Sequence, residues 1–81
     1  MKKNRIEELV GTSLADYFTD LQGTEPAGIY DMVIHPVERA MLSAVMAQAQ
    51  GNQLRAARWL GLNRNTLRKK LAQHQLLSLR S

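Results

Sequence analysis

Residues 51–71 have the sequence GNQLRAARWLGLNRNTLRKKL, and this stretch decides the fold. Apolar residues recur at helical spacing on both sides of Gly61, as in two short amphipathic helices. Asn52 and Asn63 suit the N-caps of these helices, and glycine suits the turn between them because it adopts left-handed conformations readily. Two helices joined by a three-residue turn with glycine are typical of a helix-turn-helix. We therefore expect one helix over residues 53–60 and a second helix that begins after Asn63.

Charge is divided unevenly between the two parts of the chain. Residues 1–50 carry four basic and seven acidic side chains, whereas residues 51–81 carry seven basic side chains and no acidic one, and the net charge is +4. A surface without carboxylates attracts polyanions. The alternative is a solvated basic face, but such faces usually mix both signs. The pattern favours a nucleic-acid partner.

The second helix of this motif carries the candidate base-reading side chains. If Leu67 and Leu71 face the core, helical geometry directs Asn65, Thr66 and Lys69 outward and places basic residues on the flanks. The first turn of such a helix enters the major groove of DNA. Arginine there can donate two hydrogen bonds to guanine, so Arg64 is the expected base reader. Trp59 is expected to pack against the preceding helices, while Arg55 and Arg58 are equally compatible with DNA contact and with solvation.

The first fifty residues are predicted to form two further helices. Apolar residues of 6–21 follow one helical stripe, which predicts a helix over Glu7–Leu21 with Asn4 as its cap and Gly23 as its left-handed end. Thr24 and Pro26 suit the start of the next helix, which should run from about residue 27 to residue 50. Pro36 inside this pattern should kink that helix or split it.

The second of these helices is apolar on nearly all sides and therefore needs cover. A second copy of the chain is the simplest cover, and burial by its own three neighbouring helices is the alternative. The chain of 81 residues has no cysteine, and its two histidines, His35 and His74, are not at metal-ligand spacing. Dimerisation is then the remaining way to stabilise so small a domain.

Several functional classes find no support in the sequence. No apolar run is long enough for a membrane span, and the N-terminus is not typical of a signal peptide. Neither a nucleophile with a base nor a phosphate-binding glycine loop is present, so we expect no enzyme, no cofactor and no metal.

The motif and several upstream segments resemble the Fis family of nucleoid proteins. The similarity lies in residues 51–53, 56–57 and 61–71 and, upstream, in residues 13–18, 21–23, 29–33 and 37–38. Activators of the NtrC type share the motif in their last domain. The resemblance implies an all-α fold, a four-helix homodimer with a C-terminal helix-turn-helix. It further implies a protein that binds and bends double-stranded DNA and reads an A/T-rich centre through deformability. We expect one domain over residues 1–81, with dimerisation helices in 5–50, the helix-turn-helix in 51–74 and a tail in 75–81.

The resemblance also assigns roles to individual residues. Arg64 matches the guanine contact, while Asn63 and Lys69 match positions near bases. The expected DNA-binding set is Asn52, Gln53, Asn63, Arg64, Asn65, Thr66, Arg68, Lys69 and Lys70. The expected dimer interface is Tyr17, Phe18, Leu21, Tyr30, Val33, Val37, Met41 and Val45.

Two departures from the family narrow the expected function. The chain begins too late for the N-terminal hairpin by which Fis contacts recombinases, so recombination enhancement is not expected. Ala72 and Gln73 stand where the family is rich in lysine, which predicts fewer phosphate contacts. We expect a sequence-tolerant transcriptional regulator or nucleoid-associated factor of the bacterial cytoplasm and nucleoid, with RNA polymerase as a further candidate partner. The alternatives are the detached DNA-binding domain of an NtrC-type activator and a helical protein–protein adaptor.

Overall fold

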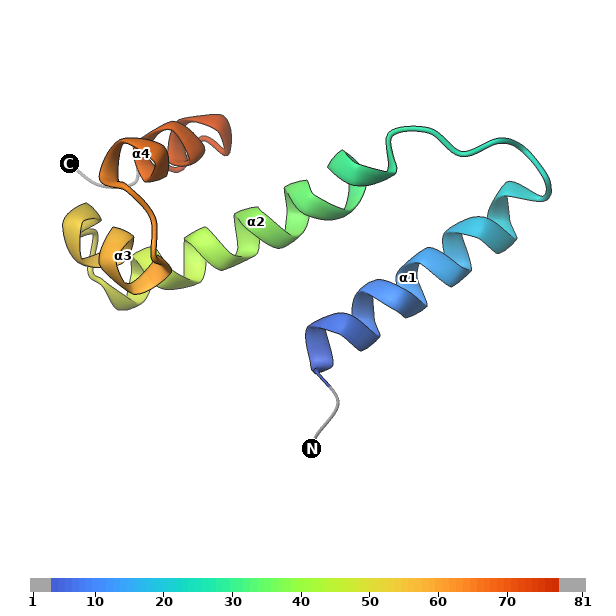
Figure 1. Ribbon diagram of the computed structural model, residues 1–81, viewed down its shortest axis with the longest axis horizontal. Coiled ribbons are helices and arrows are strands. Elements are labelled where there is room, and N and C mark those ends of the chain that lie inside the picture. The colour runs from blue at the N-terminus through green and yellow to red at the C-terminus, as the bar shows by residue number, and fades with distance from the viewer. Residues whose placement is uncertain (1–3, 78–81) are drawn as a thin grey trace. The chain divides into compact units, whose positions relative to one another are not determined.

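A computed structural model describes residues 4–77 of the chain and has four helices (Figure 1). They are α1 (Arg5–Leu21), α2 (Ile29–Gln48), α3 (Gln53–Leu60) and α4 (Arg64–Gln73). Residues 4–77 contain no strand, so the predicted all-α fold is confirmed. The last four residues of the expected tail, 78–81, lie outside the described residues. The chain divides into an N-terminal unit (Met1–Ile34) and a C-terminal unit (His35–Ser81).

In the N-terminal unit, helix α1 begins as the sequence predicts. The side-chain oxygen of Asn4 accepts hydrogen bonds from the backbone N–H groups of Ile6 (2.8 Å) and Glu7 (3.3 Å), which have no partners within the helix. The helix ends at Leu21 as expected, but its left-handed C-cap is Gln22, with a φ of 50°, and not Gly23. None of the residues of α1 is buried, and Leu9 is 68% exposed.

The expected start of the second helix is wrong. Helix α2 begins at Ile29, and Thr24 and Pro26 lie in the non-helical connection before it. The reason is Gly28, whose φ of +65° is incompatible with an α-helix and defers the first turn. The first bond of the helix follows at once, from the N–H of Met32 to the carbonyl oxygen of Gly28 at 3.0 Å.

The sequence predicts that Pro36 kinks or splits the second helix. The split does not occur. The helix runs without a break through this position. Proline removes one N–H donor, here the one that would bond the carbonyl oxygen of Met32. Both residues are exposed, so water can reach this side of the helix.

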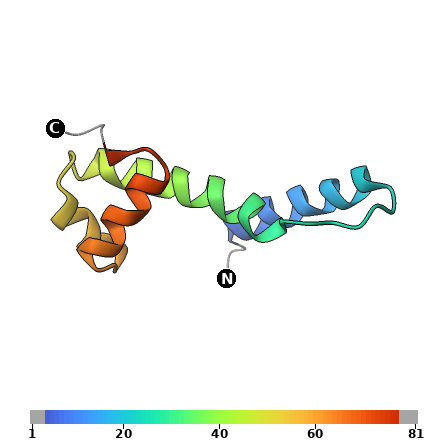
Figure 2. The ribbon, with the colours of Figure 1, turned by 90° about the horizontal axis from the view of Figure 1, so that it is seen from above.

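The C-terminal unit contains the hydrophobic core. Figure 2 shows α3 and α4 beside the C-terminal end of α2, where the buried side chains meet. Three of the seven core residues are alanines, which lets the helices approach closely. The core consists of Leu42, Ala49, Ala56, Ala57, Leu67, Leu71 and Leu76.

Much of the apolar surface of α2 is not covered by the chain itself. Tyr30 is 74% exposed, and Met32, Val37 and Met41 are exposed as well. Leu42 is the one residue within α2 that is buried. Within the C-terminal unit, α3 and α4 therefore leave Val37 and Met41 of α2 uncovered.

Candidate nucleic-acid interface

The first helix of the motif is fixed by a tight turn and an asparagine cap. After α2, Gln50 and Gly51 adopt left-handed conformations, and the N–H of Gly51 donates to the carbonyl oxygen of Met46 at 3.0 Å. Asn52 then caps α3, because its side-chain oxygen accepts the N–H of Arg55 at 3.0 Å. The role of Asn52 agrees with the sequence prediction.

The turn between α3 and α4 also forms as predicted. Gly61 has a φ of 76°, and the N–H of Leu62 donates to the carbonyl oxygen of Ala57 at 2.9 Å. Asn63 caps α4, since its side-chain oxygen accepts the N–H of Asn65 at 2.7 Å. Because the caps use the side-chain oxygens, the Nδ2 amino groups of Asn52 and Asn63 are the atoms that can donate to a ligand.

Helix α4 presents one apolar face to the core and one polar face to solvent. Leu67 and Leu71 are fully buried, as the helical spacing predicts. The predicted base-reading and phosphate-binding side chains on the opposite face are all exposed: Arg64, Asn65, Thr66, Arg68 and Lys69. Since residues 51–77 contain no acidic side chain, no carboxylate of the motif itself lowers the positive charge of this face.

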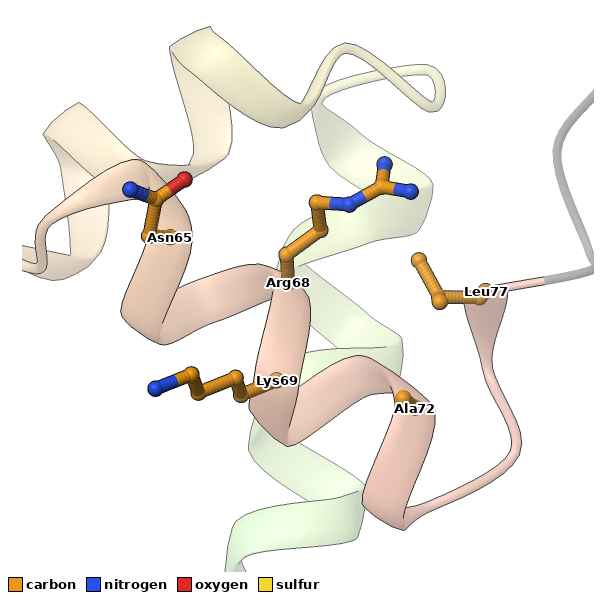
Figure 3. A pocket seen from close by; sticks show the side chains of 5 residues that line it. All are labelled: Asn65, Arg68, Lys69, Ala72 and Leu77. Carbon is orange, nitrogen blue, oxygen red and sulfur yellow. The ribbon is translucent and has the colours of Figure 1, made fainter.

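A shallow hollow of about 380 Å³ lies along this exposed face (Figure 3). Arg68 and Lys69 leave the helix in opposite directions, so their charges border the hollow on two sides. Asn65 lies toward the start of α4, and Ala72 and Leu77 form the apolar end of the hollow. Arg68 and Lys69 can therefore donate hydrogen bonds to an anionic backbone that lies in the hollow.

Two of the predicted DNA-binding residues are less accessible than the others. Gln53 is half-buried at the start of α3. The side chain of Lys70 is 32% exposed, and its Nζ lies 2.7 Å from Oε2 of Glu38 on α2. The structure therefore turns Lys70 toward α2, away from the face that Asn65, Arg68 and Lys69 share.

Glu38 is the centre of a cluster that the sequence analysis missed. Its Oε1 lies 2.8 Å from Nε2 of His74, and the guanidinium group of Arg39 donates to the carbonyl oxygen of His74. The bonds from Lys70 and then His74 keep the pKa of Glu38 below its ordinary value of 4.5, although partial burial opposes them. The Lys70–His74 spacing of four residues was the available signal, since it places both side chains on one side of α4.

The packing predicted for Trp59 is wrong. Its side chain is 55% exposed, and Leu54 on the same helix is 56% exposed. In α3 the buried positions are Ala56 and Ala57, and with only eight residues the helix has little further surface to bury. Arg55 and Arg58 are exposed beside Trp59, which leaves both interpretations of the two arginines open.

All of the predicted dimer-interface residues are partly or fully exposed. The exposed ones are Phe18, Tyr30, Val37 and Met41, and the partly buried ones are Tyr17, Leu21, Val33 and Val45. The rings of Tyr17 and Phe18 meet edge to face with centroids 5.6 Å apart. Their joint role in a dimer stays a prediction.

The described residues do not form a metal site or a membrane span. Within residues 4–77, histidines and carboxylates do not form a group of three or more that could hold a metal ion. None of the helices in this range combines the length and the apolar character that a membrane crossing requires.

The comparisons with known proteins agree with this geometry. The family described as Bacterial regulatory protein, Fis family, matches residues 34–74. A Putative Fis-like DNA-binding protein of Neisseria meningitidis is 58% identical over 72 residues, which cover 89% of this chain and 91% of that protein. One of the same name from Ralstonia nicotianae is 52% identical over 77 residues, or 95% of this chain and 100% of the relative. DNA-binding protein Fis of Mannheimia haemolytica is 42% identical over 69 residues, or 85% and 70% of the two chains. With the helix-turn-helix at its C-terminal end and these relatives, the chain belongs to the Fis family.

Proposed function

We propose that this protein is a DNA-binding and DNA-bending transcriptional regulator or nucleoid-associated factor of the bacterial cytoplasm. The observation that carries the proposal is the exposed polar face of α4, which begins at an asparagine cap and has no acidic residue along it. Arg64 stands in the first turn of that helix and would donate to guanine in the major groove. Asn63 and Lys69 would lie near bases, and Thr66 and Arg68 near phosphates. The names of the relatives, Fis-like DNA-binding protein and DNA-binding protein Fis, support the proposal.

The active form in this proposal is a homodimer. Residues 5–50 would form the dimerisation helices and residues 51–74 the DNA-binding part, within one domain. The support is the large exposed apolar surface of α1 and α2, which includes Phe18, Tyr30 and Met41. So many exposed large apolar side chains on two helices are typical of an interface. A dimer would hold two copies of α4 at a fixed spacing, and DNA with a deformable A/T-rich centre would bend most easily to meet both.

The two alternatives fit the observations less well. A detached output domain of an NtrC-type activator would share the same motif, but the Neisseria and Ralstonia relatives match this chain over 91% and 100% of their own length. A helical adaptor would use the apolar face of α2 for a different protein and would have no use for an acid-free α4. Sedimentation at micromolar concentration separates the regulator from the adaptor, because a stable monomer would favour the adaptor.

Binding to duplex DNA over a range of salt concentrations tests the proposed function. We expect tight binding to a duplex with an A/T-rich centre and guanine at the flanks, and weaker binding when the centre is G/C-rich. Arg64→Ala should lower the affinity for the first duplex by about 5- to 150-fold per protomer, the equivalent of about 1–3 kcal/mol for each bidentate base contact. Arg58→Ala removes the same charge from α3 and is the matched control.

Two results would contradict this assignment. If the wild-type protein bound neither duplex at low salt, the DNA-binding proposal would be wrong. If Arg64→Ala distinguished the first duplex from one without the flanking guanines as well as Arg58→Ala does, Arg64 would not be the base reader.

A further inference from the structure

The last turn of α4 is joined to α2 by three polar contacts. Glu38 uses both carboxylate oxygens, one for Lys70 at 2.7 Å and one for His74 at 2.8 Å. Arg39, the next residue on α2, donates to the carbonyl oxygen of His74, which is the C-cap of α4. Lys70 and His74 are one helical turn apart, so two neighbouring residues of α2 hold one side of α4.

The contact between Glu38 and His74 lies in partly buried surroundings. The side chain of Glu38 is 17% exposed and that of His74 is 2% exposed. Because an ionised carboxylate only accepts hydrogen bonds, Nε2 of His74 carries the proton of its bond to Glu38. The ring of His35 lies against the ring of His74 with centroids 4.5 Å apart and covers it from α2. Charged hydrogen bonds in such surroundings are directional and hold a geometry that apolar packing alone does not.

We propose that Glu38 is a positioning residue for DNA recognition: it fixes the rotation of α4 on α2 and withholds Lys70 from the DNA backbone. This inference rests on the proposed DNA-binding function. It also departs from the family resemblance, which places Lys70 at a backbone-contacting position. Leu67 and Leu71 anchor α4 through non-directional burial, whereas Glu38 holds the helix at its C-terminal end.

The orientation of α4 matters because the base reader stands at the opposite end of the helix. Ten residues of α-helix are about 15 Å long, so a 10° tilt at the last turn would displace Arg64 by roughly 2–3 Å. A displacement of this size exceeds the tolerance of a hydrogen bond to a base edge. Loss of the Glu38 contacts should therefore lower specificity through Arg64, although Glu38 does not itself touch DNA.

The salt dependence of DNA binding separates a lysine held by Glu38 from a lysine that binds phosphate. Each phosphate that a basic side chain neutralises adds about 0.9 to the steepness of log K against log salt. We compare Lys70→Gln with Arg68→Gln, because both variants lose one positive charge from the same turn of α4. We expect Arg68→Gln to reduce the slope by about 0.9 per protomer and Lys70→Gln to leave it unchanged. Equal reductions in the two variants would overturn the proposal.

Glu38→Gln tests the same idea from the other partner. Freed from the carboxylate, Lys70 should reach phosphate, so that the slope steepens by up to about 0.9 per protomer and the ratio of specific to nonspecific affinity falls several-fold. The double variant Glu38→Gln with Lys70→Gln should return the slope to its original value. Glu25→Gln, which removes an exposed carboxylate of the connection before α2, is the matched control and should change neither quantity. A residue that only stabilised the fold would not steepen the slope, and an unchanged slope in Glu38→Gln would contradict the proposal.

The contact between Glu38 and Lys70 can be measured in the free protein. This measurement tests the positioning role of Glu38 separately from the proposed DNA-binding function. Shifts in the unfolding midpoint of the free protein should be non-additive for Glu38→Gln with Lys70→Gln and additive for Glu38→Gln with Arg68→Gln. Additive shifts in both pairs would show that Lys70 is not held and would overturn the proposal. If coupling were present but the wild-type protein bound no duplex, the DNA-binding function and the positioning role would both be wrong, and the contact alone would stand.

Discussion

The N-terminal unit and the C-terminal unit differ in how much apolar surface each covers. No residue within the described range 4–34 is buried, although α1 has a well-formed asparagine cap and a complete apolar stripe. The C-terminal unit encloses Leu42, Leu67 and Leu71 completely with the help of small alanines. The same local rules therefore build helices in both units, but only the second has helices placed to bury one another.

Helix formation and stability of the fold therefore have different sources in this chain. Caps and helical spacing determine where a helix begins and ends, and each cap contributes about 1 kcal/mol. Burial of apolar side chains contributes more, about 1.5–3 kcal/mol for a large one. The N-terminal unit has the first contribution and lacks the second until something covers it, and in the proposed function that cover is a second copy.

The largest expected effect comes from the core of the C-terminal unit. Leu67→Ala should lower the free energy of unfolding by about 2–5 kcal/mol, because it leaves a cavity at a fully buried position. Chemical denaturation followed by circular dichroism at several protein concentrations measures this, and the loss should not depend on concentration. Leu9→Ala makes the same change at a position that is 68% exposed. An equal, concentration-independent loss in both variants would contradict the contrast between the units.

A smaller effect, of a different kind, is expected from the N-terminal unit. Phe18→Ala should weaken self-association by about 1.5–3 kcal/mol, since the exposed ring would be buried only in a dimer. Sedimentation over a concentration series measures the change, and the thermal midpoint at a given concentration should fall. Trp59→Ala removes a similarly exposed aromatic ring, 55% against 49%, from outside the predicted interface. Unaltered association in Phe18→Ala would show that this surface has another purpose.

The sequence predicted best what depends on neighbouring residues. The bounds of α3, the turn at Gly61 and the caps Asn52 and Asn63 were all correct, because each rests on a side chain or glycine acting within four residues. The inward positions of Leu67 and Leu71 followed from helical periodicity in the same way.

The errors arose where a local signal was outweighed or absent. Thr24 and Pro26 are good helix-start residues, but the left-handed Gly28 after them delays α2. Trp59 was expected inside because large aromatic residues usually pack, yet on a helix of eight residues Ala56 and Ala57 already fill the buried side. The contacts of Glu38 with Lys70 and His74 join residues 32 and 36 positions apart, and helix spacing does not indicate which residues meet across that distance.

The smallest expected effect concerns pH and again distinguishes the two units. Lys70 and His74 lower the pKa of Glu38 in the folded protein, so the folded state holds its carboxylate ionised more strongly than the unfolded state does. Stabilisation by these contacts is therefore complete above the ordinary pKa of 4.5 and is lost as the pH falls through the lower folded pKa. A partly exposed ion pair of this kind contributes about 1 kcal/mol. We expect Glu38→Gln to be less stable than the wild type at pH 6 and the difference to shrink as the pH is lowered below 4.5. Glu25→Gln, in the N-terminal unit, should match the wild type throughout. If the Glu38→Gln difference stayed constant with pH, the contacts would stabilise the fold through shape and not through charge.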